Sequence, residues 1–355
     1  MLTVVVVCHD AGGAEVLSAM IAANTYRCKW HVIGKDASPA QIVFERKGLK
    51  RFWITLKDID SVSGIMAAIS PDYLFYSTGW QIRIEDGFLQ WAKKNSVTTV
   101  AFLEHWVNYR ERFGYPNKGW QRNLPDWIAV GDEIALKLAT ELELPHLLYV
   151  KNYYFDEMRQ KAATFSSRCQ VSTSDLCVFV SEPISEGAQK LYGDAAYWGF
   201  SELATIESIL NQFTLIEKHF GVKRLLIRLH PSENALNYSE LLLKYPELLT
   251  IHSAHESSLI EDIASARLVI GFTSMALFNA YLMGKPVISF IPSKKLKCAV
   301  PIPSSCQVTD MNGLLGVNLR CEDNAAFDTR FLGGVKLDEL LTFLEEQRRE
   351  NSCHN

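Results

Sequence analysis

A histidine–proline pair at the end of an apolar run is the strongest chemical signal in the sequence. The run, residues 225–229, is typical of a buried strand, and His230 and Pro231 follow it directly. Proline suits the first turn of a helix, where it has no N–H to lose, and the free amides of such a turn bind phosphate. His230 can donate a hydrogen bond or a charge to the same phosphate, and Arg228 and Ser232 are further nucleotide-binding candidates. The alternative is a structural histidine at a strand end.

Two neighbouring hydroxyl residues mark a second candidate anion site. The pattern of residues 268–290 predicts a strand, a turn at Gly271, a helix and a second strand. Thr273 and Ser274 stand where this helix must begin. A hydroxyl at that position caps free helix amides, and the same amides bind phosphate. We expect both capping and ligand contact from this pair.

An acidic residue beside a histidine follows an apolar run in the first half of the chain. Glu104 and His105 come after residues 98–103. A base that deprotonates an acceptor hydroxyl must reach it within hydrogen-bond distance. We predict Glu104 as this base, with His105 and Asp86 as alternatives. The other interpretation is a surface loop with an ordinary ion pair.

Several residues near these motifs are candidates for binding the acceptor or the nucleotide. Arg110 and Arg112 can bind an acidic substrate, and Asn108 lies between them and the predicted base. Thr78 and Trp80 follow another predicted strand and complete the acceptor-side set: Thr78, Trp80, Asn108, Arg110 and Arg112.

A glycine pair follows the first predicted strand. His9, Asp10, Gly12 and Gly13 stand after the apolar residues 4–7. Glycines there let a ligand approach the backbone closely, so we count these four residues as substrate- or nucleotide-binding candidates. The segment has neither the G-x-G-x-x-G spacing of dinucleotide-binding proteins nor that of a phosphate-binding loop of ATPases. The alternative is a tight turn between strand and helix.

A predicted strand of the second half ends on two polar residues. Ser181 and Glu182 follow the apolar residues 176–180, and we expect them to meet the base or ribose of a nucleotide. Asp58 and Asp60 form an Asp-x-Asp string that could ligate a cation. Carboxylates before a helix more often cap it, however, and no other ligand cluster accompanies them. We predict no metal and no cofactor.

The composition is that of an ordinary globular protein. The 355 residues are 48% apolar and carry a formal charge of −4, which gives no global basic field, so we expect no nucleic-acid partner. The eight cysteines show no CxxC pair or zinc spacing and favour a reducing cytoplasm. The sequence contains no run of about 20 apolar residues, so we expect no transmembrane segment. We expect a cytoplasmic protein and leave open peripheral association with the inner face of the membrane.

Strand and helix patterns alternate along both halves of the chain. This alternation predicts parallel sheets covered by helices. The predicted strands are 4–7, 30–33, 52–55, 73–76, 98–102, 127–130, 176–180, 225–229, 249–252, 268–270 and 286–290. The main predicted helices are 16–23, 65–69, 88–94, 206–220, 238–244, 258–265, 274–283 and 337–349.

The alternation weakens between the halves, which gives a prediction of domain organisation. We predict a Rossmann-like acceptor-side domain over 1–155, a linker over 156–174, a Rossmann-like nucleotide-sugar domain over 175–332, and a helix with a tail over 333–355. Ligands of such sheets bind beyond the carboxyl ends of the strands. We therefore expect two facing domains with an active site in the cleft between them.

These motifs together resemble bacterial glycosyltransferases of the GT-B fold, of the sialyltransferase and Kdo-transferase kind. The resemblance is carried by the His-Pro pair, the Thr-Ser pair 43 residues later, and an acidic residue after a first-half strand. The second half is also similar to capsule and teichoic-acid polymer transferases. The acidic-acidic-Gly motif of the first group is absent at Glu104, and its letters occur instead at residues 85–87.

The resemblance implies a metal-independent, inverting transferase that uses a CMP-activated acidic keto-sugar, of the sialic, pseudaminic, legionaminic or Kdo type. The acceptor would be a surface glycan or glycoprotein, and His230 would stabilise the leaving phosphate. Two alternatives are a nucleotide-sugar epimerase or hydrolase of the same fold, and a polysaccharide-assembly subunit without catalytic activity.

Overall fold

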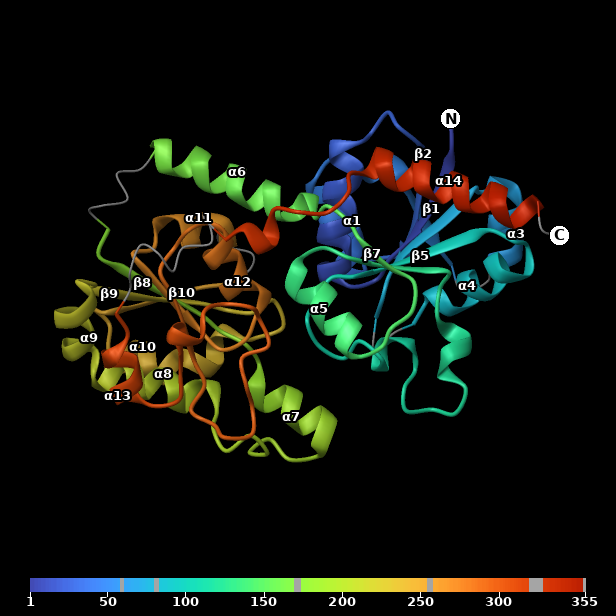
Figure 1. Ribbon diagram of the computed structural model, residues 1–355. Helices are drawn as coiled ribbons and strands as arrows, with labels where there is room; N and C mark the ends of the chain where they lie inside the picture. Colours follow the sequence, from blue (N-terminus) through green and yellow to red (C-terminus); the bar gives the residue numbers. More distant parts are fainter. Residues whose placement is uncertain (58–60, 80–82, 169–173, 254–257, 319–327, 354–355) are drawn as a thin grey trace. The chain divides into compact units, whose positions relative to one another are not determined.

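The structure, a computed structural model, describes residues 1–57, 61–79, 83–168, 174–253, 258–318 and 328–353. The chain forms two compact units, each a parallel sheet flanked by helices (Figure 1). Unit 1 comprises residues 1–157 and 329–355, and unit 2 comprises residues 158–328. The predicted pair of parallel α/β domains is therefore confirmed.

Unit 1 contains a seven-stranded sheet of order β3-β2-β1-β4-β5-β6-β7. Its strands are β1 (Thr3–Val7), β2 (Lys29–Lys35), β3 (Trp53–Leu56), β4 (Tyr73–Ser77), β5 (Thr98–Leu103), β6 (Trp127–Val130) and β7 (Leu147–Tyr149). Its helices are α1 (Ala11–Ala23), α2 (Pro39–Arg46), α3 (Val62–Ile69), α4 (Glu85–Lys94), α5 (Glu133–Glu141) and α14 (Leu337–Cys353), and α6 (Tyr153–Arg168) begins here and continues into unit 2.

Unit 2 contains a six-stranded sheet of order β10-β9-β8-β11-β12-β13. Its strands are β8 (Leu176–Val180), β9 (Arg224–Arg228), β10 (Leu249–His252), β11 (Leu268–Gly271), β12 (Val287–Phe290) and β13 (Gln307–Val308). Its helices are α7 (Ile184–Tyr192), α8 (Glu202–Asn211), α9 (Phe213–Phe220), α10 (Ser239–Lys244), α11 (Leu259–Ser265), α12 (Met275–Leu282) and α13 (Met311–Gly316).

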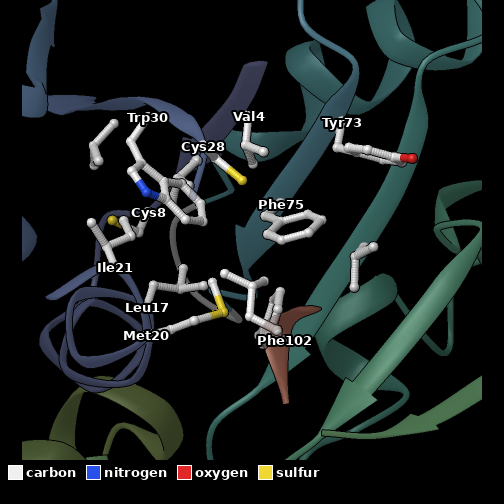
Figure 2. Packing of buried hydrophobic residues seen from close by; sticks show 14 of the residues in the cluster. Val4, Cys8, Leu17, Met20, Ile21, Cys28, Trp30, Tyr73, Phe75 and Phe102 are labelled. Atoms are coloured by element: carbon white, nitrogen blue, oxygen red, sulfur yellow. The ribbon is translucent and has the colours of Figure 1, made fainter. Parts of the chain in front are cut away.

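The central strands are apolar on both faces because helices cover both faces of each sheet. Val4 to Val7 of β1 are fully buried. In unit 1 the side chains of Leu17 and Met20 on α1 point towards Phe75 of β4 and Phe102 of β5 (Figure 2). This packing holds α1 against the sheet, and Gly13 near its start lies against Ser77 at the end of β4.

The C-terminal helix belongs to unit 1, which differs from the predicted division into domains. Leu337, Leu340, Leu341 and Leu344 recur at helical spacing and join the unit 1 core. In Figure 1 the red helix α14 accordingly lies among the elements of unit 1. Helix α6 occupies most of the segment predicted as a linker, 156–174.

One predicted helix is divided in the structure, and two short strands have no counterpart in the prediction. The predicted helix 206–220 is two helices that break at Gln212, and the break lets both pieces turn apolar side chains into one core. Strands β7 and β13 have three and two residues, too few to give an alternating pattern. Within the described part of the chain, no helix combines the length and apolar character that crossing a membrane requires.

Replacing Leu344 with alanine tests whether α14 is part of unit 1. The side chain is fully buried, so Leu344→Ala should lower the free energy of unfolding by about 2–5 kcal/mol. Leu243→Ala is the matched control, because Leu243 is 83% exposed and its loss should cost under about 0.5 kcal/mol. Denaturant titration of both variants makes the measurement. Equal losses would mean that α14 does not stabilise unit 1.

Candidate functional site

Each sheet has one place where its strand order reverses. In unit 1 the chain moves outward from β1 to β3 and then returns to β4 on the other side of β1; in unit 2 it moves from β8 to β10 and returns to β11. Ligands of parallel α/β sheets bind beyond the carboxyl ends of the two strands at such a reversal. We call these places the unit 1 switch point (residues 8–13 and 77–79) and the unit 2 switch point (residues 181–183 and 272–276).

A carboxylate bridges the two strands of the unit 2 switch point. Glu182 follows β8, and its Oε1 accepts a hydrogen bond of 2.6 Å from the backbone N–H of Thr273, which follows β11. Burial raises the pKa of Glu182 to about 7, although hydrogen bonds from Thr273 and Ser274 oppose the shift. The carboxyl group is therefore divided between its charged and neutral forms near neutral pH.

The hydroxyls of Thr273 and Ser274 have structural partners. Ser274 is the N-cap of α12, and its Oγ accepts from the N–H of Leu277, so the expected capping is present. Thr273 Oγ1 accepts a 2.6 Å hydrogen bond from the N–H of Ala299. The amides of Met275 and Ala276, in the first turn, have no acceptor within an α-helix. These amides, rather than the hydroxyls, are the groups of this turn that suit an anion.

Glu233 organises the segment that follows β9. Its Oε2 accepts from the backbone N–H of His230 at 2.8 Å, and its Oε1 accepts from Ser181 Oγ at 2.9 Å and Tyr238 Oη at 2.6 Å. Since Ser181 precedes Glu182, hydrogen bonds and chain connectivity link His230 to the unit 2 switch point. Neither Glu233 nor Tyr238 was singled out from the sequence. A carboxylate three residues after a turn-forming residue, as in a capping box, is the signal that could have found Glu233.

The imidazole of His230 is set up as a hydrogen-bond donor. Its Nδ1 accepts from the backbone N–H of Ser232 at 3.2 Å, so the neutral ring carries its proton on Nε2. Desolvation lowers the pKa of His230, while Glu233 and Glu186 oppose the shift. The residue as a whole is nevertheless exposed, so the desolvation is partial. The ring can donate from Nε2 to a ligand without first becoming charged.

Pro231 does not begin a helix, which corrects the sequence prediction. Pro231 and Ser232 form a turn closed by a hydrogen bond from the N–H of Glu233 to the carbonyl of His230. The Glu233 side chain fixes this turn by bonding back to the His230 amide. A 3₁₀ turn, residues 235–238, and the six-residue α10 follow. The helix amides expected directly after Pro231 are therefore absent.

Arg228 lies in a buried ion pair rather than at an open ligand site. Its Nη1 is 2.9 Å from Asp262 Oδ2, and both side chains are less than 10% exposed. Asp262 also bonds His252 Nδ1 at 2.9 Å. Arg228 was a nucleotide-binding candidate in the sequence. Because this pairing ties β9 to α11, we no longer include it among the groups that bind a ligand.

Packing explains the second glycine of the unit 1 pair. A Cβ added to Gly13 would lie 2.1 Å from Ser77 Cβ, and one added to Gly12 would lie 3.4 Å from Glu104 Cγ. Helix α1 therefore starts directly against the ends of β4 and β5, which leaves no room for a side chain at Gly13. The alternative of a tight strand-to-helix turn accounts for Gly13, while the contact at Gly12 is an ordinary van der Waals distance.

Glu104 and Arg112 form a buried ion pair beside this turn. Arg112 Nη1 lies 2.6 Å from Glu104 Oε1, and the two side chains are 6% and 9% exposed. The same Nη1 donates to the carbonyl and hydroxyl of Thr78. Burial raises the pKa of Glu104, and Arg112 opposes the shift. Arg112 and Thr78, predicted to bind the acceptor, thus have partners within unit 1, and Glu104 Oε2 is buried without a hydrogen-bond partner among the described residues.

The remaining residues of this loop also have roles within the fold. His105 Nδ1 accepts from the N–H of Trp106 at 3.0 Å, and burial lowers the pKa of His105 to about 4. His105 is therefore neutral at pH 7 with its proton on Nε2, which suits a donor and not a base. Arg110 donates to the carbonyl of Leu142 at 2.6 Å. Asn108 is exposed and adopts a left-handed backbone with φ of 58°.

Asp10 is the accessible carboxylate of the unit 1 switch point. It occupies the N-cap position of α1 but makes no capping hydrogen bond, and it is half-buried. Desolvation raises its pKa, and the charges of His9 and Arg112 oppose the shift. His9 Nδ1, one residue earlier, is buried without a hydrogen-bond partner among the described residues. Within the described part of the chain, Asp10 thus presents a carboxylate without a capping hydrogen bond, within electrostatic range of the Glu104–Arg112 ion pair.

The competing acidic motif begins helix α4. Asp86 is held by Arg83 at 2.7 Å. Glu85 is buried, and this burial raises its pKa to about 8. Trp80 and the Asp58–Asp60 string lie outside the described residues. Among the described residues, no group of three or more His, Cys, Asp or Glu side chains is arranged to hold a metal ion.

The sequence matches no protein-family model, and no curated protein is significantly similar to it. Solved structures are similar in fold. A UDP-N-acetylglucosamine 2-epimerase from Neisseria meningitidis bound to UDP-GlcNAc superposes with a TM-score of 0.57 and 11% identity over 92% of this chain and 91% of that one. HepE from Anabaena in complex with UDP superposes with a TM-score of 0.58 and 10% sequence identity over the whole of both chains. A variant of the wall teichoic acid polymerase TagF soaked with CDPG superposes with a TM-score of 0.51 and 13% sequence identity. The match covers 98% of this chain and 88% of that one.

These similarities establish the GT-B fold of two parallel, Rossmann-like α/β domains. At 10–13% identity they carry the fold alone. The narrower resemblance to CMP-dependent transferases stays a prediction, and so do the roles of the site residues.

The raised pKa of Glu182 predicts a pH-dependent stability. Its pKa is about 7 in the folded protein against 4.5 for a free side chain, so the folded state binds the proton more tightly. The resulting stabilisation is full below about pH 4.5 and is lost as the pH rises through about 7. Compared with Glu182→Gln, the wild type should therefore lose thermal stability between about pH 5 and pH 8. Melting curves of both proteins across this range make the test, and parallel curves would contradict the assignment.

Proposed function

We propose that the protein transfers a sugar from a nucleotide-activated donor to a glycan acceptor. The observation that carries this proposal is the continuous polar network of unit 2, which runs from His230 through Glu233 and Ser181 to Glu182 and Thr273. Its Glu182 and Thr273 end lies at the strand reversal, where sheets of this kind bind nucleotides. The network combines a neutral hydrogen-bond donor, a helix start and a carboxylate.

Each part of the network suits one part of a nucleotide-sugar. The first-turn amides of α12, at Met275 and Ala276, and the Nε2–H of His230 suit the phosphate that departs with the nucleotide. The Glu182 carboxylate suits the ribose hydroxyls, since a carboxylate accepts hydrogen bonds from both. In this scheme protein donors stabilise the leaving phosphate without a metal.

The fold relatives support nucleotide-sugar chemistry but differ in their ligands. HepE is bound to UDP, the epimerase to UDP-GlcNAc, and TagF was soaked with CDPG. For this chain we propose a CMP-activated acidic keto-sugar as the donor, on the resemblance of the His-Pro and Thr-Ser pairs to such transferases. The similarity to UDP-N-acetylglucosamine 2-epimerases favours a second candidate, epimerisation of a UDP-sugar.

Unit 1 supplies the acceptor side in this proposal. The acceptor oxygen attacks the anomeric carbon, the bond to the phosphate oxygen breaks, and a carboxylate takes the acceptor proton, with inversion of configuration. We assign that carboxylate to Asp10, because Glu104 is buried and already paired with Arg112. Glu104 then positions Arg112 and the loop around it, which revises the base predicted from the sequence.

Nucleotide binding tests the donor site directly. Calorimetric titration of CMP, UDP, GDP, CMP-sialic acid and UDP-GlcNAc should identify a ligand whose affinity is the same with and without EDTA. His230→Ala should lower the affinity for that ligand about three- to tenfold, which corresponds to the loss of one hydrogen bond. The melting temperature should stay unchanged, because His230 is an exposed residue. No binding by any of the five would contradict the proposal. A loss of binding in EDTA would contradict its metal-free form.

The base is tested by a pair of isosteric variants. Asp10→Asn should lower kcat by about 10²–10⁴-fold with little effect on nucleotide affinity, because the base acts on the acceptor. Glu104→Gln should lower the free energy of unfolding by about 1–3 kcal/mol, since it weakens a buried charged hydrogen bond, and should keep kcat within tenfold. An inactive but stable Glu104→Gln beside an active Asp10→Asn would restore Glu104 as the base. Product analysis separates transfer from epimerisation.

A further inference from the structure

A lysine-rich loop follows β12 at the carboxyl edge of the unit 2 sheet. Residues 292–299 have the sequence Pro-Ser-Lys-Lys-Leu-Lys-Cys-Ala. The loop therefore leaves the sheet on the edge that holds the unit 2 switch point, one strand away from β11. Nothing in the proposed roles above uses its three lysines.

The far end of this loop is fastened to the switch point itself. The backbone N–H of Ala299 donates to Thr273 Oγ1 at 2.6 Å. Burial raises the pKa of the neighbouring Cys298 thiol, and the charge of Glu182 raises it further, so Cys298 lies within electrostatic range of Glu182. The loop thus ends beside the carboxylate and the helix start that form the proposed nucleotide site.

The rest of the loop is held against unit 2 by specific contacts. Ser293 Oγ donates to the carbonyl of Trp198 at 2.7 Å and accepts from the N–H of Lys295 at 3.1 Å. Lys295 Nζ donates to the carbonyl of Tyr197 at 2.9 Å and lies 4.8 Å from the centre of its ring. Leu296 packs on the unit 2 core. The loop backbone is therefore fixed at both ends and in the middle.

Two of the three lysines remain available to a ligand. Lys294 and Lys297 are exposed, and neither forms an ion pair or hydrogen bond with a described residue. Lys295 is not available in the same way, because its Nζ donates a hydrogen bond to the carbonyl of Tyr197. Two ammonium groups without a described partner are thus carried by a fixed loop whose Ala299 end is bonded to the switch point.

The carboxylates at the switch point create a need for positive charge that these lysines can supply. The described ionisable groups of the network are Glu182, Glu233 and the neutral His230, while Arg228 is paired with Asp262 inside the unit. The phosphates of a nucleotide are anionic, so a site lined by carboxylates would repel them unless cations lie close by.

We propose that Lys294 and Lys297 form the phosphate-binding subsite for the nucleotide donor, supplying the positive charge that a metal ion provides in other enzymes. The inference rests on the proposed function. It assigns the phosphates to the lysine loop together with the first turn of α12, and it makes binding depend on the number of phosphate charges. Affinity should rise from nucleoside to monophosphate to diphosphate, and should fall with added salt.

A lipid surface is the competing ligand class, because aromatic residues adjoin the loop. Tyr192, Tyr197 and Trp198 pack against one another, with the two tyrosine rings stacked at 3.8 Å, so they already have partners. The hydrogen bond from the loop to Thr273 points to the switch point instead. We therefore favour phosphates of a bound nucleotide over lipid headgroups.

The experiment compares two double variants with equal loss of charge. Lys294→Gln with Lys297→Gln removes the proposed subsite. Lys218→Gln with Lys223→Gln is the control, because Lys223 precedes β9 and so lies at the amino edge of the same sheet. Affinities for uridine, UMP, UDP, cytidine, CMP and CDP are measured by calorimetry at low and high salt, and binding to phosphatidylglycerol vesicles is measured by co-sedimentation.

The loop variant should bind the mono- and diphosphates at least about tenfold more weakly, with a weaker salt dependence, and the preferred nucleoside as tightly as the wild type does. The control variant should match the wild type throughout. Unchanged phosphate affinity in the loop variant would overturn the subsite while leaving the proposed function intact, and loss of vesicle binding alone would assign the loop to a membrane. If the wild type binds none of the six compounds, the subsite is overturned, and the proposed function is decided by the titration of GDP and the two nucleotide-sugars described above.

Discussion

The reversal of strand order in each parallel sheet is the constraint on which the rest of the structure depends. All strands of a unit end on the same edge, and the chain leaves the two central strands, β8 and β11 in unit 2, in opposite directions. The backbone therefore separates beyond those ends and cannot satisfy its own polar groups there. Side chains from neighbouring loops must fill that place. In unit 2 Glu182 does so, by accepting the amide of Thr273 across the gap.

The two units meet this constraint in different ways, and the difference separates their proposed roles. In unit 1 the helix start is packed directly on β4 through Gly13, and Arg112 closes the neighbouring space by pairing with Glu104 and Thr78. At the start of α1, Asp10 is half-buried and makes no capping hydrogen bond. In unit 2 the corresponding place keeps a helix start, a carboxyl group with a pKa near neutrality and an exposed imidazole. At the first edge Arg112 is thus paired with Glu104 and Thr78, while the second edge presents groups that complement a nucleotide.

The fold could be predicted from the sequence because it depends on long apolar runs and helical periodicity, as in residues 4–7 and 337–344. The positions of His230, Glu182 and Thr273 followed from the rule that polar residues after strands gather at one edge. The side-chain partners could not be predicted. The sequence does not show whether Arg112 binds a substrate or pairs with Glu104, which is 8 positions away along the chain. It also does not show whether Arg228 faces a ligand or pairs with Asp262, which is 34 positions away. The helix expected after Pro231 does not form, because the Glu233 side chain accepts the His230 amide and stabilises a turn there. Local helix propensity does not decide between a helix and this turn.

Amide hydrogen exchange with and without the preferred nucleotide tests whether the donor nucleotide binds at the strand reversal of unit 2. Binding there should slow exchange at residues 181–182, 230–233, 272–277 and 293–299 and leave exchange at residues 9–13 and 104–112 unchanged. Slower exchange confined to residues 9–13 and 77–79 would contradict binding at unit 2, because the nucleotide would then bind at the unit 1 switch point.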